Sequence, residues 1–286
     1  GEVVTLSLPL TMSTFGAAPW ASGSAPTSCD DDGPTMLPRL AAGDCPALVA
    51  GENTLTSAEL DRAVRIYLPE VTAGETYPLV LLWHGFGSSV DDILEVSGMD
   101  DHVADRGFIL AVPASTEGSG VEWASLTADD SVDAAFFDDL VTCLQASLPV
   151  DEDRIHVSGF SAGGLWSGWL TVFRSEIIAS VAAFSPGLIP PFEAPAGKVP
   201  YLAAWGGEAD VAYDQDFNLL TPALVADLVG AGHFVVACDH GLGHEWLPEW
   251  TPWVLDFLLD HPRGVDPSPY AAGLPMAFPE FCVIAE

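Results

Sequence analysis

Apolar and polar residues along the middle of the chain alternate with two different periods. Residues 63–69, AVRIYLP, alternate between apolar and polar positions, which is typical of a half-buried strand. Residues 78–83, PLVLLW, form a continuous apolar run, which indicates a strand covered on both faces. Apolar positions recur with helical spacing near 91–106 and again over roughly 131–147. The pattern predicts strands and helices that take turns along the chain.

This alternation continues to about residue 261. Further strands are predicted at 108–113, 154–160, 177–185, 201–206 and 233–239, and further helices from residue 162 to about 174 and at 215–230 and 249–261. Such an order predicts the α/β class, with a mostly parallel central sheet and helices on both faces. Residues 61–263 are expected to form one core domain. The flanking segments are rich in Gly, Pro and Ser, so we expect 1–60 to be an N-terminal extension packed on the core and 264–286 a C-terminal tail that wraps it.

One short motif combines a serine with small residues at the end of a predicted strand. Gly159-Phe160-Ser161-Ala162-Gly163 follows residues 154–158, RIHVS, and precedes a predicted helix. In the G-x-S-x-G turn, side chains two positions before and after the serine would clash, and glycine removes them. The serine hydroxyl is then held above the sheet edge at a helix N-terminus, which favours a developing anion. Ser161 is therefore the candidate nucleophile.

A serine needs a base, and the base needs an acid that orients it. After a G-x-S-x-G turn these partners follow in the order acid, then histidine. Asp210, in GGEAD after the strand at 201–206, is the preferred acid, while Asp214 and Asp216 are competitors placed at the start of the next helix. His244, in the glycine-flanked GLGHEW after the last strand, is the preferred base, and His240 is its rival.

An oxyanion needs two backbone N–H donors. The N–H of Ala162 lies directly after the nucleophile, and a second donor is expected from HGFGSS at 84–89, after the strand at 78–83. Gly85 and Gly87 allow this loop to approach closely, so the N–H of Phe86 is the natural donor.

The charge balance limits the partners that the chain can have. The sequence holds 8 Lys+Arg against 41 Asp+Glu, for a formal net charge of −33. Such a surface repels phosphate backbones and anionic lipid, so neither nucleic acid nor membrane is expected as a partner. The excess acid keeps the protein soluble, or it reflects a saline habitat in which salt screens the self-repulsion.

Five cysteines are scattered, without a CxxC pair that would suggest zinc, and no metal or cofactor is expected. Cys29 and Cys45 bracket a loop rich in Gly, Pro and Asp, and a disulfide between them would staple the N-terminal extension. Such a bond implies an exported, extracellular protein. Cys143, Cys238 and Cys282 could form one further bridge and leave a free thiol, and the pairing stays open. Calcium binding by residues 29–33, CDDDG, also stays open.

Several segments between about 60 and 260 together resemble one family. They are RIYLPE, LVLLWHGFGSS, FFDDLVTCL, VDEDRIHVSGFSAGG, WGGEAD and GHEW. The chain resembles an α/β-hydrolase, and most of all the secreted esterases that include polyhydroxybutyrate depolymerases and feruloyl esterases. The resemblance implies the α/β-hydrolase fold, a triad of Ser161, Asp210 and His244, and oxyanion donors at Phe86 and Ala162. Depolymerases of this branch often carry cysteine where Phe86 stands.

The expected activity is that of a secreted serine carboxylesterase that needs no cofactor and acts as a monomer. Aromatic side chains near the predicted site, namely Phe86, Trp123 and Trp246, are expected to contact the substrate. The substrate is then a small or polymeric neutral ester, either a feruloyl or cinnamoyl ester or a polyester such as polyhydroxybutyrate or an aromatic polyester. The alternatives are a serine peptidase on the same fold and a non-catalytic binding protein.

Overall fold

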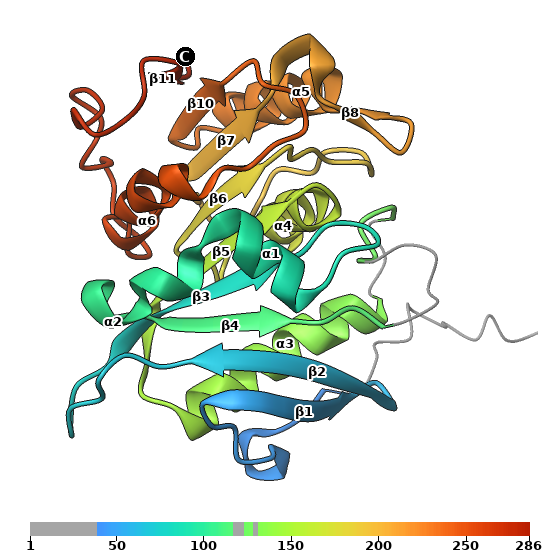
Figure 1. Cartoon of the computed structure of the whole chain (residues 1–286), viewed down its shortest axis with the longest axis vertical. Helices are drawn as coiled ribbons and strands as arrows, with labels where there is room; N and C mark the ends of the chain where they lie inside the picture. The colour runs from blue at the N-terminus through green and yellow to red at the C-terminus, as the bar shows by residue number, and fades with distance from the viewer. Residues whose placement is uncertain (1–38, 117–122, 128–130) are drawn as a thin grey trace, which may run out of the picture. The chain divides into compact units, whose positions relative to one another are not determined.

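A computed structural model describes residues 39–116, 123–127 and 131–286, and within them a nine-stranded sheet organises the fold (Figure 1). The strand order across the sheet is β1-β2-β4-β3-β5-β6-β7-β10-β11. The strands are β1 (Gly51–Ser57), β2 (Leu60–Tyr67), β3 (Tyr77–Trp83), β4 (Ile109–Pro113), β5 (Val150–Phe160), β6 (Ser180–Phe184), β7 (Tyr201–Trp205), β10 (Val235–Asp239) and β11 (Cys282–Ile284).

The centre of the sheet is parallel and its two margins are antiparallel. Strands β4, β3, β5, β6, β7 and β10 run in the same direction, while β2 pairs antiparallel with β4, β1 with β2, and β11 with β10. The carboxyl ends of all six central strands therefore meet at one edge. The sheet also takes β1 and β11 from the segments that the sequence predicted as extension and tail.

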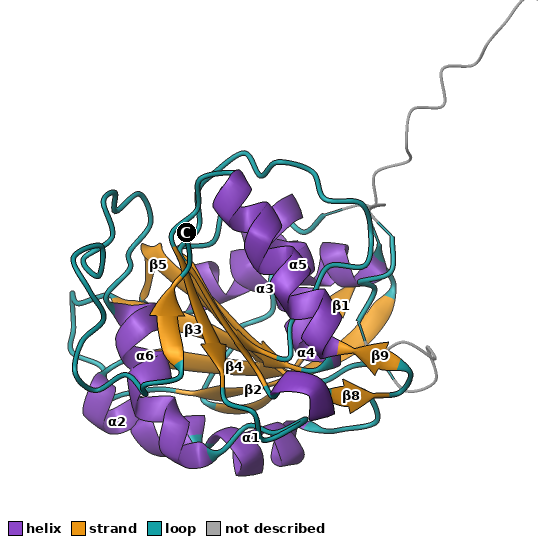
Figure 2. Ribbon diagram, turned by 90° about the horizontal axis from the view of Figure 1, so that it is seen from above, coloured by secondary structure: helices purple, strands orange, loops and turns teal. Residues whose placement is uncertain are grey.

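Helices cover both faces of the sheet (Figure 2). They are α1 (Val90–Ser97), α2 (Val103–Arg106), α3 (Val132–Ser147), α4 (Ala162–Phe173), α5 (Phe217–Gly230) and α6 (Thr251–Leu259), with 3-10 turns at Ala42–Asp44, Met99–His102, Gly207–Ala209 and Pro248–Trp250. Helices α3, α4 and α5 lie on one face, and α1, α2 and α6 lie on the other. The structure therefore confirms the predicted mostly parallel α/β sheet.

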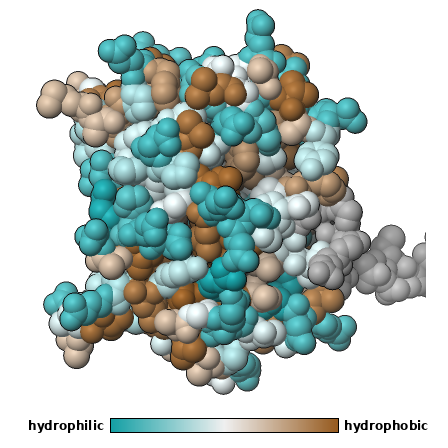
Figure 3. Space-filling view, viewed as in Figure 1, coloured by the Kyte–Doolittle hydropathy of each residue, from teal (hydrophilic) through white to brown (hydrophobic). Residues whose placement is uncertain are grey.

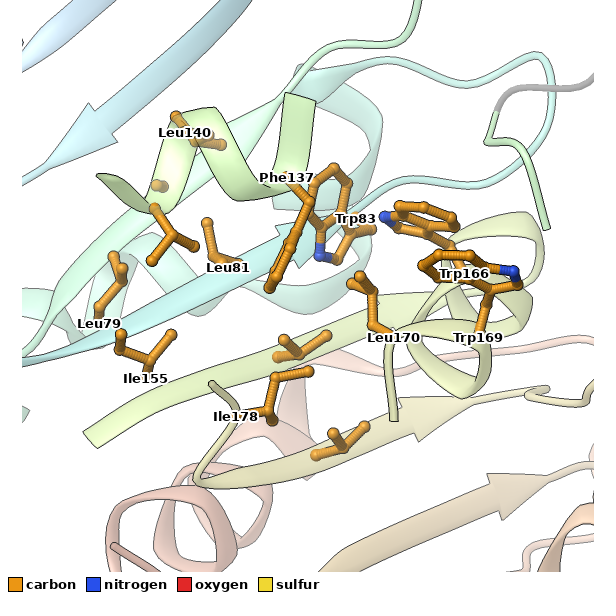
Figure 4. Packing of buried hydrophobic residues seen from close by; sticks show 14 of the residues in the cluster. Leu79, Leu81, Trp83, Phe137, Leu140, Ile155, Trp166, Trp169, Leu170 and Ile178 are labelled. Atoms are coloured by element: carbon orange, nitrogen blue, oxygen red, sulfur yellow. The ribbon is translucent and has the colours of Figure 1, made fainter. Parts of the chain in front are cut away.

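Each face of the sheet has its own hydrophobic core, because the fully buried central strands carry apolar side chains on both sides. In the core beneath α3 and α4, Leu79 and Leu81 of β3 pack beside Ile155, and Trp83 ends the same row (Figure 4). The ring of Trp83 meets that of Trp166 from α4 edge to face, with 6.1 Å between the centroids. Aromatic packing of this kind stabilises the edge of the sheet at which the carboxyl ends of the central strands lie.

Within the described residues, two disulfides join distant parts of the chain. Cys45 is bonded to Cys143 of α3, which ties the segment before β1 to a helix of the core, and Cys238 of β10 is bonded to Cys282 of β11. The expected bond between Cys29 and Cys45 is wrong, because Cys45 has a different partner. Cys29 and the 29–33 segment lie outside the described residues.

Hydrophilic and hydrophobic residues are interspersed on the face shown in Figure 3. None of the helices in the described part of the chain is long and apolar enough to cross a membrane. Lys198, the single lysine of the sequence, is exposed and lies just before β7 begins, at the amino-terminal edge of the sheet.

Candidate active site

Ser161 occupies the single residue between β5 and α4, at the carboxyl edge of the sheet. Its backbone has φ 59° and ψ −116°, a conformation that L-residues rarely adopt. Its backbone N–H donates to the carbonyl of Phe184 at 3.0 Å, which anchors the turn to β6. Strained backbone of this kind persists only where the surroundings enforce it, and it is common at functional sites.

The two glycines of the motif are enforced by backbone contacts. A Cβ on Gly159 would lie 2.3 Å from the carbonyl oxygen of Gly163, and a Cβ on Gly163 would lie 2.1 Å from the carbonyl oxygen of Trp83. Both distances are far below a normal van der Waals contact, and the atoms involved are backbone atoms that cannot turn aside. The structure thus gives the physical reason for the G-x-S-x-G spacing.

Asp210 and His244 meet beside this turn. Asp210 is fully buried, and its Oδ1 lies 2.6 Å from Nδ1 of His244. The Asp210 carboxylate also accepts a hydrogen bond from the backbone N–H of Gly206 at 2.8 Å and one from the hydroxyl of Ser185. These donors compensate for burial of the charge and hold the carboxylate toward the imidazole.

The rival residues lie elsewhere. Asp214 sits in the turn between the short strands β8 (Val211–Ala212) and β9 (Gln215–Asp216), and Asp216 ends that hairpin. His240 packs against Trp250, with 4.6 Å between the ring centroids. Burial lowers the pKa of His240 below its ordinary value. The structure therefore brings Asp210 and His244 together, in preference to the competitors.

Two aromatic rings hold the imidazole of His244. Phe160 stacks on one side at 4.6 Å with an interplanar angle of 29°, and Phe217 of α5 stacks at 5.0 Å with an angle of 24°. The stacks limit tilting of the imidazole, while the bond to Asp210 fixes its rotation. With Nδ1 directed at the carboxylate, Nε2 is the ring nitrogen available to a reacting group.

The loop after β3 approaches Ser161 closely. A Cβ on Gly85 would lie 3.4 Å from Cβ of Ser161, so glycine leaves the space above the serine open. Buried His84 supports this loop, because its Nε2 accepts from the backbone N–H of Ser115 at 3.1 Å and its Nδ1 therefore donates to the carbonyl of Gly85 at 2.9 Å. Phe86, whose backbone N–H is the expected oxyanion donor, directly follows Gly85 in this loop.

Two pockets lined by described residues open beside Ser161. The larger has a volume of about 320 Å³ and is lined by Phe86, Ser125, Leu126, Ser161, Ala162, Leu165, Ala212, Tyr213, Gln215 and Phe217. The smaller has a volume of about 160 Å³ and is lined by Gly85, Phe86, Ser88, Asp92, Ile93, Val96, Phe160, Ser161, Tyr213 and His244. Ser161 and His244 thus share one cavity. A larger hollow of about 650 Å³ lies away from this chemistry, between β1, β2 and α2.

Of the three aromatic residues expected to contact substrate, only Phe86 lines the pockets. Trp123 is fully buried, and its indole N–H donates to the carbonyl of His84 at 2.8 Å. Trp246 is 2% exposed and stacks on Phe184 at 4.2 Å. The prediction of substrate contact is therefore wrong for both tryptophans. Trp123 instead helps to hold the loop that carries Phe86.

Sequence reasoning missed four residues of the site. Tyr213 lines both pockets from the hairpin turn, Phe160 and Phe217 hold the imidazole, and Ser185 bonds to Asp210. Phe160 could have been found from the sequence, because it directly precedes the candidate nucleophile Ser161 in the motif. Nothing in the sequence pattern marks Tyr213, Phe217 or Ser185. Within the described residues, no three His, Cys, Asp or Glu side chains gather as a metal site.

A family model described as "Putative esterase" matches residues 56–251, which include the motif, Asp210 and His244. The chain belongs to this esterase family. This match and the superposed structures confirm the esterase family and the α/β-hydrolase fold expected from the sequence.

Curated relatives of this esterase include an "Oxidized polyvinyl alcohol hydrolase" from Pseudomonas sp, 26% identical, with a match covering 53% of this chain and 52% of the relative. "Feruloyl esterase D" from Neurospora crassa is 27% identical over 53% of this chain and 57% of its own length. The chain thus spans about half the length of the curated relatives that it matches.

Solved structures share the fold of the esterase at lower identity. One titled "Crystal Structure of pOPH Native" superposes with a TM-score of 0.70 at 23% identity, covering 84% of this chain and 96% of that one. A ferulic acid esterase superposes with a TM-score of 0.54 at 18% identity, covering 72% of this chain and 97% of that one. An acylaminoacyl peptidase also superposes, with a TM-score of 0.58 at 14% identity over 75% of this chain and 42% of that one.

Proposed function

We propose that the esterase is a serine carboxylesterase in which Ser161 is the nucleophile, His244 the general base and acid, and Asp210 the residue that orients His244. One observation carries the proposal. The serine on a strained turn lines the same cavity as an imidazole whose other nitrogen lies 2.6 Å from a fully buried carboxylate. This arrangement has the parts that activate a hydroxyl at neutral pH.

The proposed reaction has two halves. His244 Nε2 takes the proton of Ser161 as Oγ bonds to the ester carbon, and the resulting oxyanion accepts hydrogen bonds from the backbone N–H groups of Phe86 and Ala162. The bond between the carbon and the alcohol oxygen then breaks, and His244 gives its proton to that oxygen. Water, activated by His244 in the same way, releases the acid and restores the Ser161 hydroxyl.

The proposed substrates are neutral esters, either feruloyl or cinnamoyl esters or polyester fragments such as polyhydroxybutyrate or an aromatic polyester. The net charge of −33 disfavours anionic substrates and helps carboxylate products to leave. The name of one relative, a feruloyl esterase, supports the feruloyl class, and that of another, a hydrolase of oxidised polyvinyl alcohol, supports a polymeric substrate. The two disulfides support the proposal that the enzyme is exported.

The test uses a panel of p-nitrophenyl esters of increasing acyl length, methyl ferulate, polyhydroxybutyrate, an aromatic polyester and a chromogenic peptide amide. Ester turnover without amide turnover is expected, and Ser161→Ala is expected to lower kcat by at least about 10⁴-fold. A fluorophosphonate probe should label the unchanged protein at Ser161 and fail to label the variant. Ser88 and Ser125, which line the two pockets, remain in the variant as internal controls.

Persistence of label or turnover in Ser161→Ala would overturn the assignment of the nucleophile. Faster cleavage of the peptide amide than of every ester would favour the peptidase alternative, and no turnover or labelling at all would favour a binding protein.

A further inference from the structure

The two pockets beside Ser161 contain different parts of the proposed catalytic machinery. Ala162, whose backbone N–H is a proposed oxyanion donor, lines the larger pocket and is absent from the lining of the smaller. His244 lines the smaller pocket and is absent from the lining of the larger. The two halves of a bound ester would therefore meet different surroundings.

The direction of proton transfer assigns the pockets. His244 must give its proton to the leaving alcohol oxygen, so that oxygen has to lie on the His244 side of Ser161. The alcohol then continues into the smaller pocket, and the acyl group, on the other side of the carbonyl carbon, faces the larger one. Leu126, Leu165 and Phe217 make the larger pocket mainly apolar, which suits a hydrophobic or aromatic acyl group.

The two pockets have an aromatic pair in common. Phe86 and Tyr213 line both of them, and their rings meet edge to face with 4.8 Å between the centroids. Phe86 comes from the loop after β3. Tyr213 comes from the turn of the β8–β9 hairpin, much later in the sequence. A Cβ on Gly87 would lie 3.9 Å from the Tyr213 hydroxyl, so the hairpin reaches across to this loop.

The smaller pocket contains a carboxylate. Asp92 of α1 lines it, and the hydrogen bonds that Asp92 accepts within the described residues, from Ser88 and Ser89, all fall on Oδ2 as part of the cap of the helix. Its neighbour Asp91 points elsewhere, because its Oδ1 pairs with Arg65 at 2.5 Å and it lines neither pocket. The charge of Asp92 is therefore placed where the alcohol half of the ester would bind.

We propose that the larger pocket receives the acyl group and the smaller one the alcohol, that Phe86 and Tyr213 form the wall between them, and that Asp92 selects neutral or cationic alcohols against anionic ones. The assignment rests on the proposed function, because it uses His244 as the group that protonates the alcohol. It narrows the substrate class to esters whose alcohol is compact and carries no negative charge.

The charge selection is tested with three butanoate esters whose alcohols differ in charge. They are the cationic choline, its neutral isostere 3,3-dimethylbutan-1-ol and the anionic glycolate. One elementary charge about 6 Å away in water changes kcat/KM by about threefold. Asp92→Asn is therefore expected to lower the ratio of kcat/KM for the choline ester to that for the glycolate ester by about tenfold at low salt. The asparagine can still accept the helix-cap bonds.

Asp91→Asn is the matched control, since it removes the same charge one residue away from a side chain outside the pocket. Its ratio should change by less than about twofold, because solvent screens a charge directed away from the site. Equal changes in Asp91→Asn and Asp92→Asn would show a general field effect and overturn the charge selection.

The pocket assignment is tested by filling one pocket at a time. Ala212→Phe should lower kcat/KM for p-nitrophenyl octanoate relative to the butanoate on the order of tenfold, with a small effect on the ratio between alcohols. Val96→Phe should penalise the dimethylbutyl ester relative to the methyl ester of butanoate, with a small effect on the acyl ratio. Thermal unfolding checks each variant, and Ala212→Leu and Val96→Leu serve if a phenylalanine variant fails to fold.

Reversed ratios, or identical ratios in both variants, would overturn the assignment. A wild-type protein that cleaves none of these esters would instead overturn the proposed function, so the two failures are distinguishable.

Discussion

The hydroxyl of Ser185 donates to the carboxylate of Asp210, with its Oγ 3.1 Å from Oδ1 and 2.9 Å from Oδ2. Ser185 itself has a φ of 46°, in the left-handed region that non-glycine residues seldom occupy. The residue directly after β6 is thus strained, and its side chain holds the carboxylate that contacts His244. Ser185 is a positioning residue in this arrangement.

Ser185→Ala is expected to lower kcat about tenfold and to leave KM nearly unchanged. A hydrogen bond to a charged group contributes about 1.5–3 kcal/mol, and loss of about 1.4 kcal/mol of transition-state stabilisation is a factor of ten. The measurement is steady-state kinetics on p-nitrophenyl butanoate.

Ser158→Ala is the matched control, because this fully buried serine of β5 also loses one hydrogen bond, from its hydroxyl to the carbonyl of Ala182. It should lower the unfolding free energy by about 1 kcal/mol without lowering kcat. Equal kcat values for the two variants would contradict the role of Ser185.

Gly163→Ala is expected to lower kcat by at least about 100-fold. The new methyl group would lie 2.1 Å from the Trp83 carbonyl oxygen, so the turn that carries Ser161 must shift, and a displacement of about 1 Å at a catalytic group costs about that factor. Gly230→Ala, at the end of α5 where nothing lies within 4 Å of a Cβ, is the control and should keep full activity. An active Gly163→Ala enzyme would contradict the strained turn.

Loss of the Cys45–Cys143 disulfide is expected to destabilise the protein more than loss of Cys238–Cys282. The two bonds span sequence separations of 98 and 44 residues, which in the chain-entropy model correspond to about 4.7 and about 4 kcal/mol. Urea unfolding of the two Cys→Ser double variants checks the order. The reverse order would mean that native-state contacts around β11 outweigh loop closure.

Acid is expected to destabilise the fold through His156. This histidine is fully buried, and burial lowers its pKa from 6.5 to about 3, helped by the nearby positive charge of Arg154. Its Nδ1 donates to Ser180, whose hydroxyl donates to the carbonyl of Leu258, so a second proton on Nε2 would have no acceptor among the described residues.

Between pH 6.5 and 3 the unfolded chain binds a proton at residue 156 that the native protein excludes, so the unfolding free energy falls as pH falls. At pH 4.5 the loss from this residue is on the order of 2–3 kcal/mol relative to neutral pH. Burial also lowers the pKa of His233 and His261, which adds to the same trend. His156→Gln should reduce the pH dependence of the unfolding free energy, measured by urea unfolding between pH 7 and 4.5. His102→Gln, at a partly exposed position, should leave that dependence unchanged.

The sequence pattern predicted the parallel sheet and the candidate triad because each depends on local signals. The continuous apolar run of β3 and the glycines beside Ser161 are visible without coordinates. Asp210 and His244 follow from their places after strands. Membership in the esterase family confirms the fold, while the roles of these residues stay proposals.

The β1–β2 and β8–β9 hairpins were not predicted from the sequence, and both have the same physical reason. The turn between β1 and β2 places Ala58 and Glu59 at positive φ, and the turn between β8 and β9 does the same with Tyr213 and Asp214. Two-residue turns of this kind usually contain Asn-Gly or Asp-Gly, which is the signal that a reader of sequences looks for. Neither turn contains such a pair, so the sequence did not predict the hairpins. For the same reason it did not predict that Tyr213 lines the pockets.

Contacts between distant segments account for the remaining errors. The partner of Cys45 lies 98 residues away on a helix, and no spacing rule selects it. Trp123 and Trp246 belong to loops that the sequence placed near the site. Both indoles are buried in the interior, and the sequence pattern does not reveal that packing.

The position of Lys198 has a practical consequence. It is exposed, it stands at the amino-terminal end of β7, and the length of that strand separates it from the edge that carries Ser161 and Asp210. An aldehyde-bearing bead that captures this side-chain amine would hold the enzyme by the edge opposite its active site, with the two pockets beside Ser161 turned toward the bulk liquid.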